Sequence, residues 1–178
     1  MYNVNIPFLL DKNGYRTGYA SFKTTYDLYI TPYRDVYPII ALRKGKISLS
    51  HLSAELEVND CLFLGKNELF RLSSEETYEF HYIQFTDAFY CRKGDDRFFL
   101  DKCSFFVNTL SLNLLQLEPQ YLQYVTSYLL HFKQLSTQEP NEINSIWVHN
   151  TIERILLFAL SMHIETFHSI NHVKLPLH

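Results

Sequence analysis

The sequence has no long apolar run and no concentration of basic residues, and these absences argue against two classes of protein. Its most apolar run, Ile155–Leu160, directly follows Arg154 and is far shorter than the ~20 residues that span a bilayer. Lys and Arg are scattered along the chain and the net charge is −3, which argues against binding duplex nucleic acid by phosphate neutralisation. We expect neither a membrane span nor direct contact with DNA.

Cysteines are also few. Cys61, Cys91 and Cys103 are odd in number and form no CxxC pair, as is typical of a protein without a disulfide framework. The segment Met1–Asp11 lacks the basic region that begins a signal peptide. These features predict a cytoplasmic protein.

Short apolar segments separated by polar turns fill the first half of this chain of 178 residues, which is long enough for one well-buried core. Before Pro38, the segment Ser21–Thr31 alternates like a single half-buried strand. Between Pro38 and Phe89, short runs recur at intervals typical of a small antiparallel barrel or sandwich. These runs are Ile39–Leu42, Ile47–Leu49, Leu56–Val58, Leu62–Leu64 and Tyr78–Phe85. The spacing of these runs along the chain resembles that of the strands in a cupin-like jelly roll.

Two helices are predicted after the barrel. The first begins at Glu118 and Pro119 and continues at helical spacing to about Gln134; the second, with a broad apolar face, extends from about Glu142 to Phe167. We divide the chain into a barrel sensor region with a connector, 1–110, and a helical dimerisation region packed on it, 111–178, together one compact unit. The predicted fold is mostly β with α, a cupin-like double-stranded β-helix (jelly-roll barrel) followed by two antiparallel helices.

Three stretches of the chain carry a resemblance to a known family. They are Leu42–Gly45 at the end of an early strand, Val58–Leu64 at a turn into an apolar strand, and Phe80–Cys91 at a passage from strand to helix. Together with the order of parts, they resemble the N-terminal regulatory domain of AraC-type (arabinose-regulator-like) transcription factors over nearly the whole chain. The loop Phe63–Glu68 departs from the family because it lacks the usual proline.

The chain ends at His178, where a regulator of this type would begin its helix-turn-helix domain. The resemblance therefore implies that DNA is bound only through a domain missing here. Two alternatives stay open: an excised sensor domain, and a natural regulator without a DNA reader.

The resemblance also implies where an effector would bind. Sugar-binding members of the family place pocket residues on the strands that match Phe70–Leu72 and Phe80–Tyr82, and an arginine near the position of Arg34. Tyr and Phe line apolar pockets while Tyr offers a hydroxyl for orientation, so a sugar or another small metabolite is the expected effector. An equally supported alternative is that the aromatic side chains simply fill a small barrel. The predicted ligand-binding residues are Tyr26, Arg34, Phe70, Leu72, Phe80 and Tyr82.

Enzymatic chemistry has weaker support. Enzymatic cupins resemble one another in carrying two histidines separated by one residue, a following glutamate and a third histidine, whereas this chain offers only His51, Glu55, Glu57 and His81. It has no GxSxG nucleophile motif, and Cys91, beside Arg92 and Lys93, is the only cysteine in an electropositive setting that could lower the pKa of its thiol. We predict no catalytic residue, metal or cofactor. The alternative is a small-molecule cupin enzyme, a metal-dependent isomerase or dioxygenase.

The second helix predicts self-association. Trp147, Asn150, Arg154 and Leu157 recur at heptad-like steps, and a polar Asn inside an apolar seam can fix the register of paired helices. The expected partners are thus a small-molecule effector and a second copy of the chain, bound through the C-terminal helices. One alternative is a helix packed wholly within the subunit. Another is a stand-alone module that restrains a full-length regulator by mixed pairing.

Overall fold

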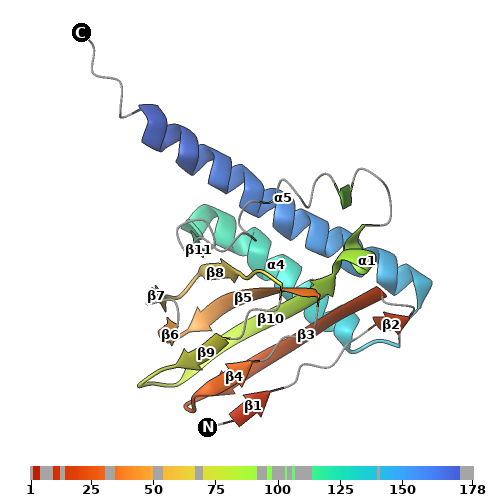
Figure 1. Ribbon diagram of the computed structural model, residues 1–178, viewed down its shortest axis with the longest axis horizontal. Helices are drawn as coiled ribbons and strands as arrows, with labels where there is room; N and C mark the ends of the chain where they lie inside the picture. Colours follow the sequence, from red (N-terminus) through yellow and green to blue (C-terminus); the bar gives the residue numbers. More distant parts are fainter. Residues whose placement is uncertain are drawn as a thin grey trace.

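Two mainly antiparallel sheets form most of the first part of the molecule, and two long helices lie together on one side of it (Figure 1). The computed structural model describes residues 2–4, 10–12, 15–30, 35–49, 54–66, 70–91, 96–97, 103, 106, 114–139 and 141–172. No helix in these ranges is both long enough and apolar enough to cross a membrane.

The larger sheet has six strands in the order β11-β8-β5-β10-β3-β2. Their bounds are β2 Leu10–Lys12, β3 Tyr15–Thr24, β5 Val36–Lys44, β8 Asp60–Phe63, β10 Tyr78–Thr86 and β11 Leu114–Gln116. The smaller sheet has five strands in the order β1-β4-β9-β6-β7. Their bounds are β1 Tyr2–Val4, β4 Leu28–Ile30, β6 Ile47–Leu49, β7 Ala54–Leu56 and β9 Phe70–Ser73.

The strand order is that of a jelly roll. The larger sheet contains the run β3-β10-β5-β8 and the smaller contains β4-β9-β6-β7, so the chain passes back and forth between two four-stranded layers. Strand β1 extends the smaller layer by pairing in parallel with β4. The predicted cupin-like jelly roll followed by two helices is confirmed.

One predicted strand is wrong. The segment Ser21–Thr31 is two strands, because β3 ends at Thr24 and β4 begins at Leu28 in the other sheet. The chain turns between them: the Tyr26 amide donates to the Thr24 hydroxyl at 3.0 Å, and Asp27 pairs with Arg71 of β9 at 2.6 Å. An alternating pattern cannot reveal such a change of sheet, since both strands keep the same parity.

The larger sheet separates two apolar cores. Between the sheets lies a group that we call the barrel core: Leu28, Ile30, Ile40, Leu42, Ile47, Leu49, Leu56, Leu62, Leu64, Phe70, Leu72, Tyr78, Phe80 and Tyr82. On its other face, side chains such as Ile39, Ile83 and Phe85 pack against the helices. The two faces follow from the period of two along each strand.

Three helices complete the described fold. A short helix, α1 (Asp87–Tyr90), follows β10 directly and is capped by the Thr86 hydroxyl, which accepts from the Phe89 amide at 3.2 Å. Helix α4 (Pro119–Ser136) starts with a proline in its first turn, where no donor is lost. Helix α5 (Glu142–His172) begins where the Asn141 side chain accepts from the Asn144 amide at 2.8 Å.

Candidate functional site

Strand β10 of the larger sheet lies between the two apolar cores. Tyr78, Phe80 and Tyr82 on one of its faces belong to the barrel core, whereas Ile83 and Phe85 on the other face belong to the core beneath the helices. The strand is also paired on both edges, to β3 and to β5. A side chain that moves in the barrel core therefore displaces the same strand that packs against the helices.

Four of the six predicted ligand-binding residues lie together in the barrel core. Phe70, Leu72, Phe80 and Tyr82 are all fully buried. The rings of Phe70 and Tyr82 stack with centroids 6.2 Å apart, and those of Tyr78 and Phe80 lie 5.9 Å apart. These side chains fill the space between the sheets, so the ligand assignment stays a prediction beside the alternative that they only form a core.

The other two predicted residues are placed differently. The Tyr26 side chain is 58% exposed and lies at the turn between β3 and β4, outside the barrel core. Its backbone carbonyl accepts from the Tyr78 hydroxyl at 2.7 Å. Arg34 lies outside the described residues, as does His51 of the alternative metal set.

A buried glutamine in the barrel wall was missed by the sequence analysis. Gln84 is almost completely inaccessible, and its side-chain oxygen accepts from the Tyr82 hydroxyl at 3.3 Å. Its backbone carbonyl accepts from the Thr17 hydroxyl at 3.0 Å. Burial raises the pKa of Tyr82 well above its ordinary value, so this phenol stays a donor. The signal in the sequence was a polar residue sharing the parity of Tyr82 and Phe80.

Of the residues considered for a metal site, His81 is separated from Glu55 and Glu57, while His51 lies outside the described residues. Within β10, His81 lies on the face opposite Phe80 and Tyr82, and Glu55 and Glu57 interact with Lys46 at 2.5 Å and 3.9 Å. In the described part of the chain, no three His, Cys, Asp or Glu side chains are grouped as metal ligands would be.

His81 is held between the larger sheet and the helical layer. Its Nδ1 atom lies 2.7 Å from the Tyr19 hydroxyl, and the two rings stack at 5.8 Å. The Tyr19 ring in turn packs on Phe132 of α4 at 5.7 Å. Burial, with the nearby Arg43 charge, lowers the pKa of His81 to about 4, so the imidazole is neutral at pH 7.

Two of the cysteines are core residues. Cys61 and Cys103 are buried in the apolar cluster beneath the helices. Burial raises the pKa of both thiols to about 12, which keeps them protonated and unreactive at neutral pH.

The predicted dimerisation residues lie on the outside of α5. Trp147 and Leu157 are half exposed, and Asn150 and Arg154 are exposed as well. The Trp147 ring meets His131 of α4 edge-on at 5.6 Å. Most of the exposed large apolar side chains among the described residues belong to these two helices; they are Tyr124, Leu130, Ile143, Ile146, Trp147 and Leu157. Pairing through them stays a prediction.

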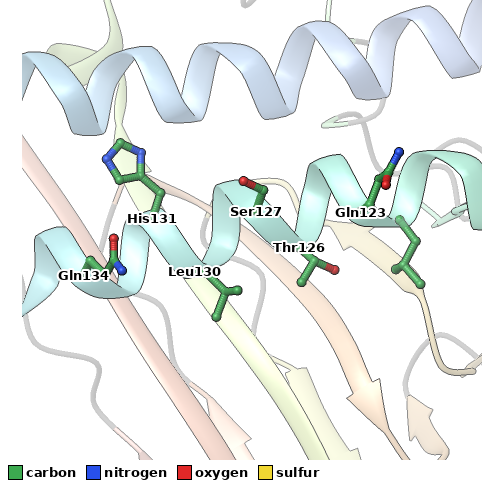
Figure 2. Close-up of a pocket in the computed structure, with 7 residues that line it drawn as sticks. Gln123, Thr126, Ser127, Leu130, His131 and Gln134 are labelled. Carbon is green, nitrogen blue, oxygen red and sulfur yellow. The ribbon is translucent and has the colours of Figure 1, made fainter.

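Two of the open hollows on the outer surface have volumes near 700 Å³. One, of about 700 Å³, follows α4 (Figure 2) and is lined by Leu122, Gln123, Thr126, Ser127, Leu130, His131 and Gln134. The other, of about 720 Å³, is lined mainly by charged and hydroxyl side chains, among them Asp27, Lys46, Ser48 and Glu55. Neither hollow is lined by a barrel-core residue.

No protein-family model matches this chain, and no curated protein matches it. Solved structures similar to it include apo ToxT from Vibrio cholerae, 13% identical with a TM-score of 0.48, where the match covers 82% of this chain and 55% of ToxT. EutQ from Clostridium difficile is 12% identical with a TM-score of 0.35, covering 46% of this chain and 66% of EutQ. A cupin-2 domain protein from Shewanella frigidimarina is 12% identical with a TM-score of 0.32, covering 47% and 81%. At these identities the likeness concerns the fold alone.

Proposed function

We propose that this chain is the effector-sensing and dimerisation domain of a cytoplasmic AraC-type transcription regulator. A small molecule, a sugar or another small metabolite, binds in the barrel and controls a DNA-binding domain that is not part of this sequence. The domain senses and does not catalyse. The support is the residue-level resemblance of Leu42–Gly45, Val58–Leu64 and Phe80–Cys91, together with a jelly roll followed by two antiparallel helices.

The observation that carries the proposal is that the two faces of β10 contribute side chains to the two different cores. Tyr82 and Phe80 face the barrel core, and Ile83 and Phe85 face the helices. An effector that displaces a barrel side chain shifts the same strand on which the helices rest. Such a sensor works by population shift, so the effector binds one arrangement of the helices more tightly, by ~1 to 3 kcal/mol for ordinary coupling.

The buried pair Tyr82 and Gln84 would orient the effector. Together these side chains offer a phenolic donor and an amide in an otherwise apolar interior, which is how small-molecule pockets combine bulk with a few polar contacts. A ligand hydroxyl would replace their mutual bond of 3.3 Å. This role rests on the predicted ligand site.

Native mass spectrometry of the untreated protein tests the proposal first. A metal-free dimer supports the sensor function, and an added small mass identifies the class of effector. Stoichiometric metal on a monomer contradicts it and favours the cupin enzyme. Exchange of subunits with a full-length regulator would instead favour the module that acts by mixed pairing.

The binding role is then measured with Tyr82→Phe, which removes only the hydroxyl, against Tyr124→Phe at an exposed position on α4. Isothermal titration uses the small molecule found by mass spectrometry or, failing one, a panel of monosaccharides. Tyr82→Phe should weaken binding about 2- to 10-fold, the effect of one lost hydrogen bond of about 0.5–1.5 kcal/mol. Equal affinity in both variants would remove Tyr82 from the site.

A further inference from the structure

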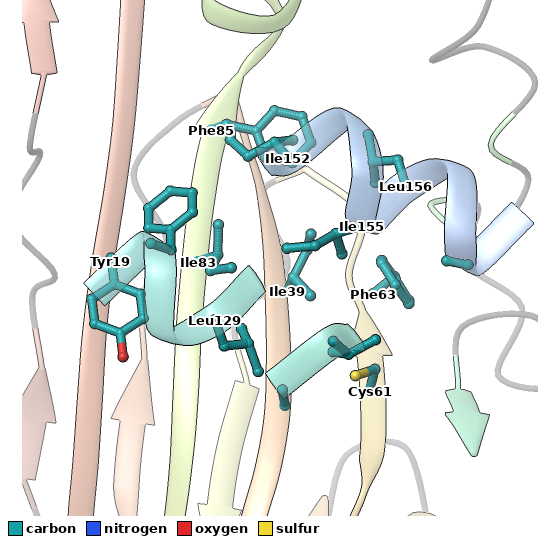
Figure 3. Packing of buried hydrophobic residues seen from close by; sticks show 14 of the residues in the cluster. Tyr19, Ile39, Cys61, Phe63, Ile83, Phe85, Leu129, Ile152, Ile155 and Leu156 are labelled. Atoms are coloured by element: carbon teal, nitrogen blue, oxygen red, sulfur yellow. The ribbon is translucent and has the colours of Figure 1, made fainter. Parts of the chain in front are cut away.

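The outer face of α4 is unusual for a surface helix because it is almost uncharged. Among the residues from Pro119 to Ser136, Lys133 is the only Lys, Arg, Asp or Glu. The inner face of the helix, including Leu129, packs on the sheet with Ile83 and its neighbours (Figure 3). Outward-facing helix surfaces are normally charged, whereas depletion of charge is typical of the centre of an interface.

The hollow on this face, which we call the saddle, has its smallest side chains near the middle of its lining. Thr126 and Ser127 are the smallest side chains that line it, and larger ones stand on both sides along the helix: Leu122 and Gln123 toward its start, and Leu130, His131 and Gln134 toward its end. The side chains project from α4 along the length of the hollow (Figure 2). Small residues at the middle of a helix face let a second helix approach closely.

The residues along the saddle are complementary to the same residues of a second, antiparallel copy. If a second α4 crosses antiparallel about a two-fold axis between positions 128 and 129, Ser127 meets Leu130 of the other copy. The same axis sets Thr126 against His131 and Gln123 against Gln134. Small meets large and amide meets amide. Lys133 is the only charged residue of α4 itself, and the guanidinium of Arg43 from β5 donates to the Thr126 hydroxyl at 2.8 Å. A two-fold interface requires this kind of self-complementarity.

We propose that two copies of the chain pair through antiparallel α4 helices, with the two-fold axis between positions 128 and 129, next to the small side chains of Thr126 and Ser127. This inference rests on the homodimer of the proposed function and moves its centre from the predicted seam on α5 to α4. Trp147, which touches His131, lies beside the saddle and extends the apolar surface onto the first turns of α5, where Ile143 and Ile146 are also exposed.

The surface offered for pairing follows the whole length of α4. An α4 helix of 18 residues is about 27 Å long at 1.5 Å per residue, and the exposed apolar side chains at the start of α5 widen the contact. A specific interface buries more than ~1,000 Å² in total, and the pairing that we propose requires the two helical surfaces to reach this area. The second hollow has four carboxylates and one lysine in its lining, so two copies of it would bring like charges together.

Cysteine cross-linking tests the position of the axis. Ser127→Cys and Asn150→Cys each place a thiol on an exposed helical position, and the natural Cys91 serves as the background in the unsubstituted protein. Under mild oxidation, Ser127→Cys should form a covalent dimer within minutes, and Asn150→Cys should form little more than the background. Cross-linking of Asn150→Cys alone would overturn the α4 axis while leaving the homodimer intact.

A matched pair of surface substitutions gives the second measurement. Leu130 on α4 is 51% exposed and Leu157 on α5 is 49% exposed, so aspartate at either position leaves the fold of the subunit in place. Leu130→Asp should raise the dimer dissociation constant at least 10-fold in sedimentation equilibrium, and Leu157→Asp should change it less than 3-fold. The reverse order favours the α5 seam and refutes the α4 axis. A monomeric parent protein refutes both this inference and the proposed homodimer.

Discussion

Replacement of His81 by glutamine should remove the loss of folding stability in acid that this residue causes. The imidazole lies between the larger sheet and α4, with Nδ1 2.7 Å from the Tyr19 hydroxyl. The charged groups near it are Arg43 and Lys133, which lower its pKa together with burial, and Glu79, which raises it. The net result is a pKa of about 4 in place of 6.5.

The magnitude follows from this difference. A pKa that is lowered by folding means that the unfolded chain binds the proton more tightly, so acid favours unfolding. The stabilisation by neutral His81 is complete above pH 6.5 and is lost as the pH falls toward 4. At 1.36 kcal/mol for each pH unit, the full loss is about 3 kcal/mol. Partial contact with solvent screens this to about 1–2 kcal/mol.

Urea unfolding at pH 7.0, 6.0 and 5.0, followed by far-UV circular dichroism, measures the effect. The difference in the free energy of unfolding between the parent protein and His81→Gln should shift by about 1 kcal/mol or more over this range, with the parent losing stability in acid. Other titrating groups are common to both proteins and cancel in the difference. A difference that stays constant with pH would refute the description of His81 as a buried neutral group.

Three further predictions concern the barrel and its contact with α4. Phe80→Ala should lower the free energy of unfolding by about 3–5 kcal/mol in urea, because the removed ring is fully buried; a loss below ~1 kcal/mol would contradict a packed barrel. Gly45→Ala should reduce thermal stability by at least ~1 kcal/mol, since φ is +77° and a Cβ atom would lie 2.7 Å from the Thr77 carbonyl. Arg43→Met, which removes a 2.8 Å bond to Thr126, should cost about 0.5–1.5 kcal/mol and speed amide exchange in α4; unchanged exchange would show that this bond does not hold the helix.

Comparison of sequence and structure shows which features local patterns can determine. The predicted strand Tyr78–Phe85 is confirmed within β10, because alternation of side chains is a local property of the backbone. The first helix was predicted from Pro119 to about Gln134 and ends at Ser136. The second was predicted to end near Phe167 and extends to His172, since no proline or glycine in that stretch stops it.

The assignment of strands to sheets required the tertiary structure. Residues 21 to 31 keep one apolar parity through the turn at Tyr26, yet the strands on either side pair in different sheets. Tyr26 shows the same limit of a local pattern. It has the sequence parity of the core residues around it, yet its side chain is exposed. Pairing partners are far apart in the sequence, so no local pattern encodes them.

The sequence by itself determined the type and order of the elements: aromatic-rich strands with alternating side chains, followed by two amphipathic helices. Tertiary structure alone decided which groups meet. It brought Phe70 and Tyr82 into one core and set Gln84 against Tyr82. It also turned His81 away from that core, toward α4, because neighbouring residues on a strand point to opposite faces and the fold alone fixes what covers each face.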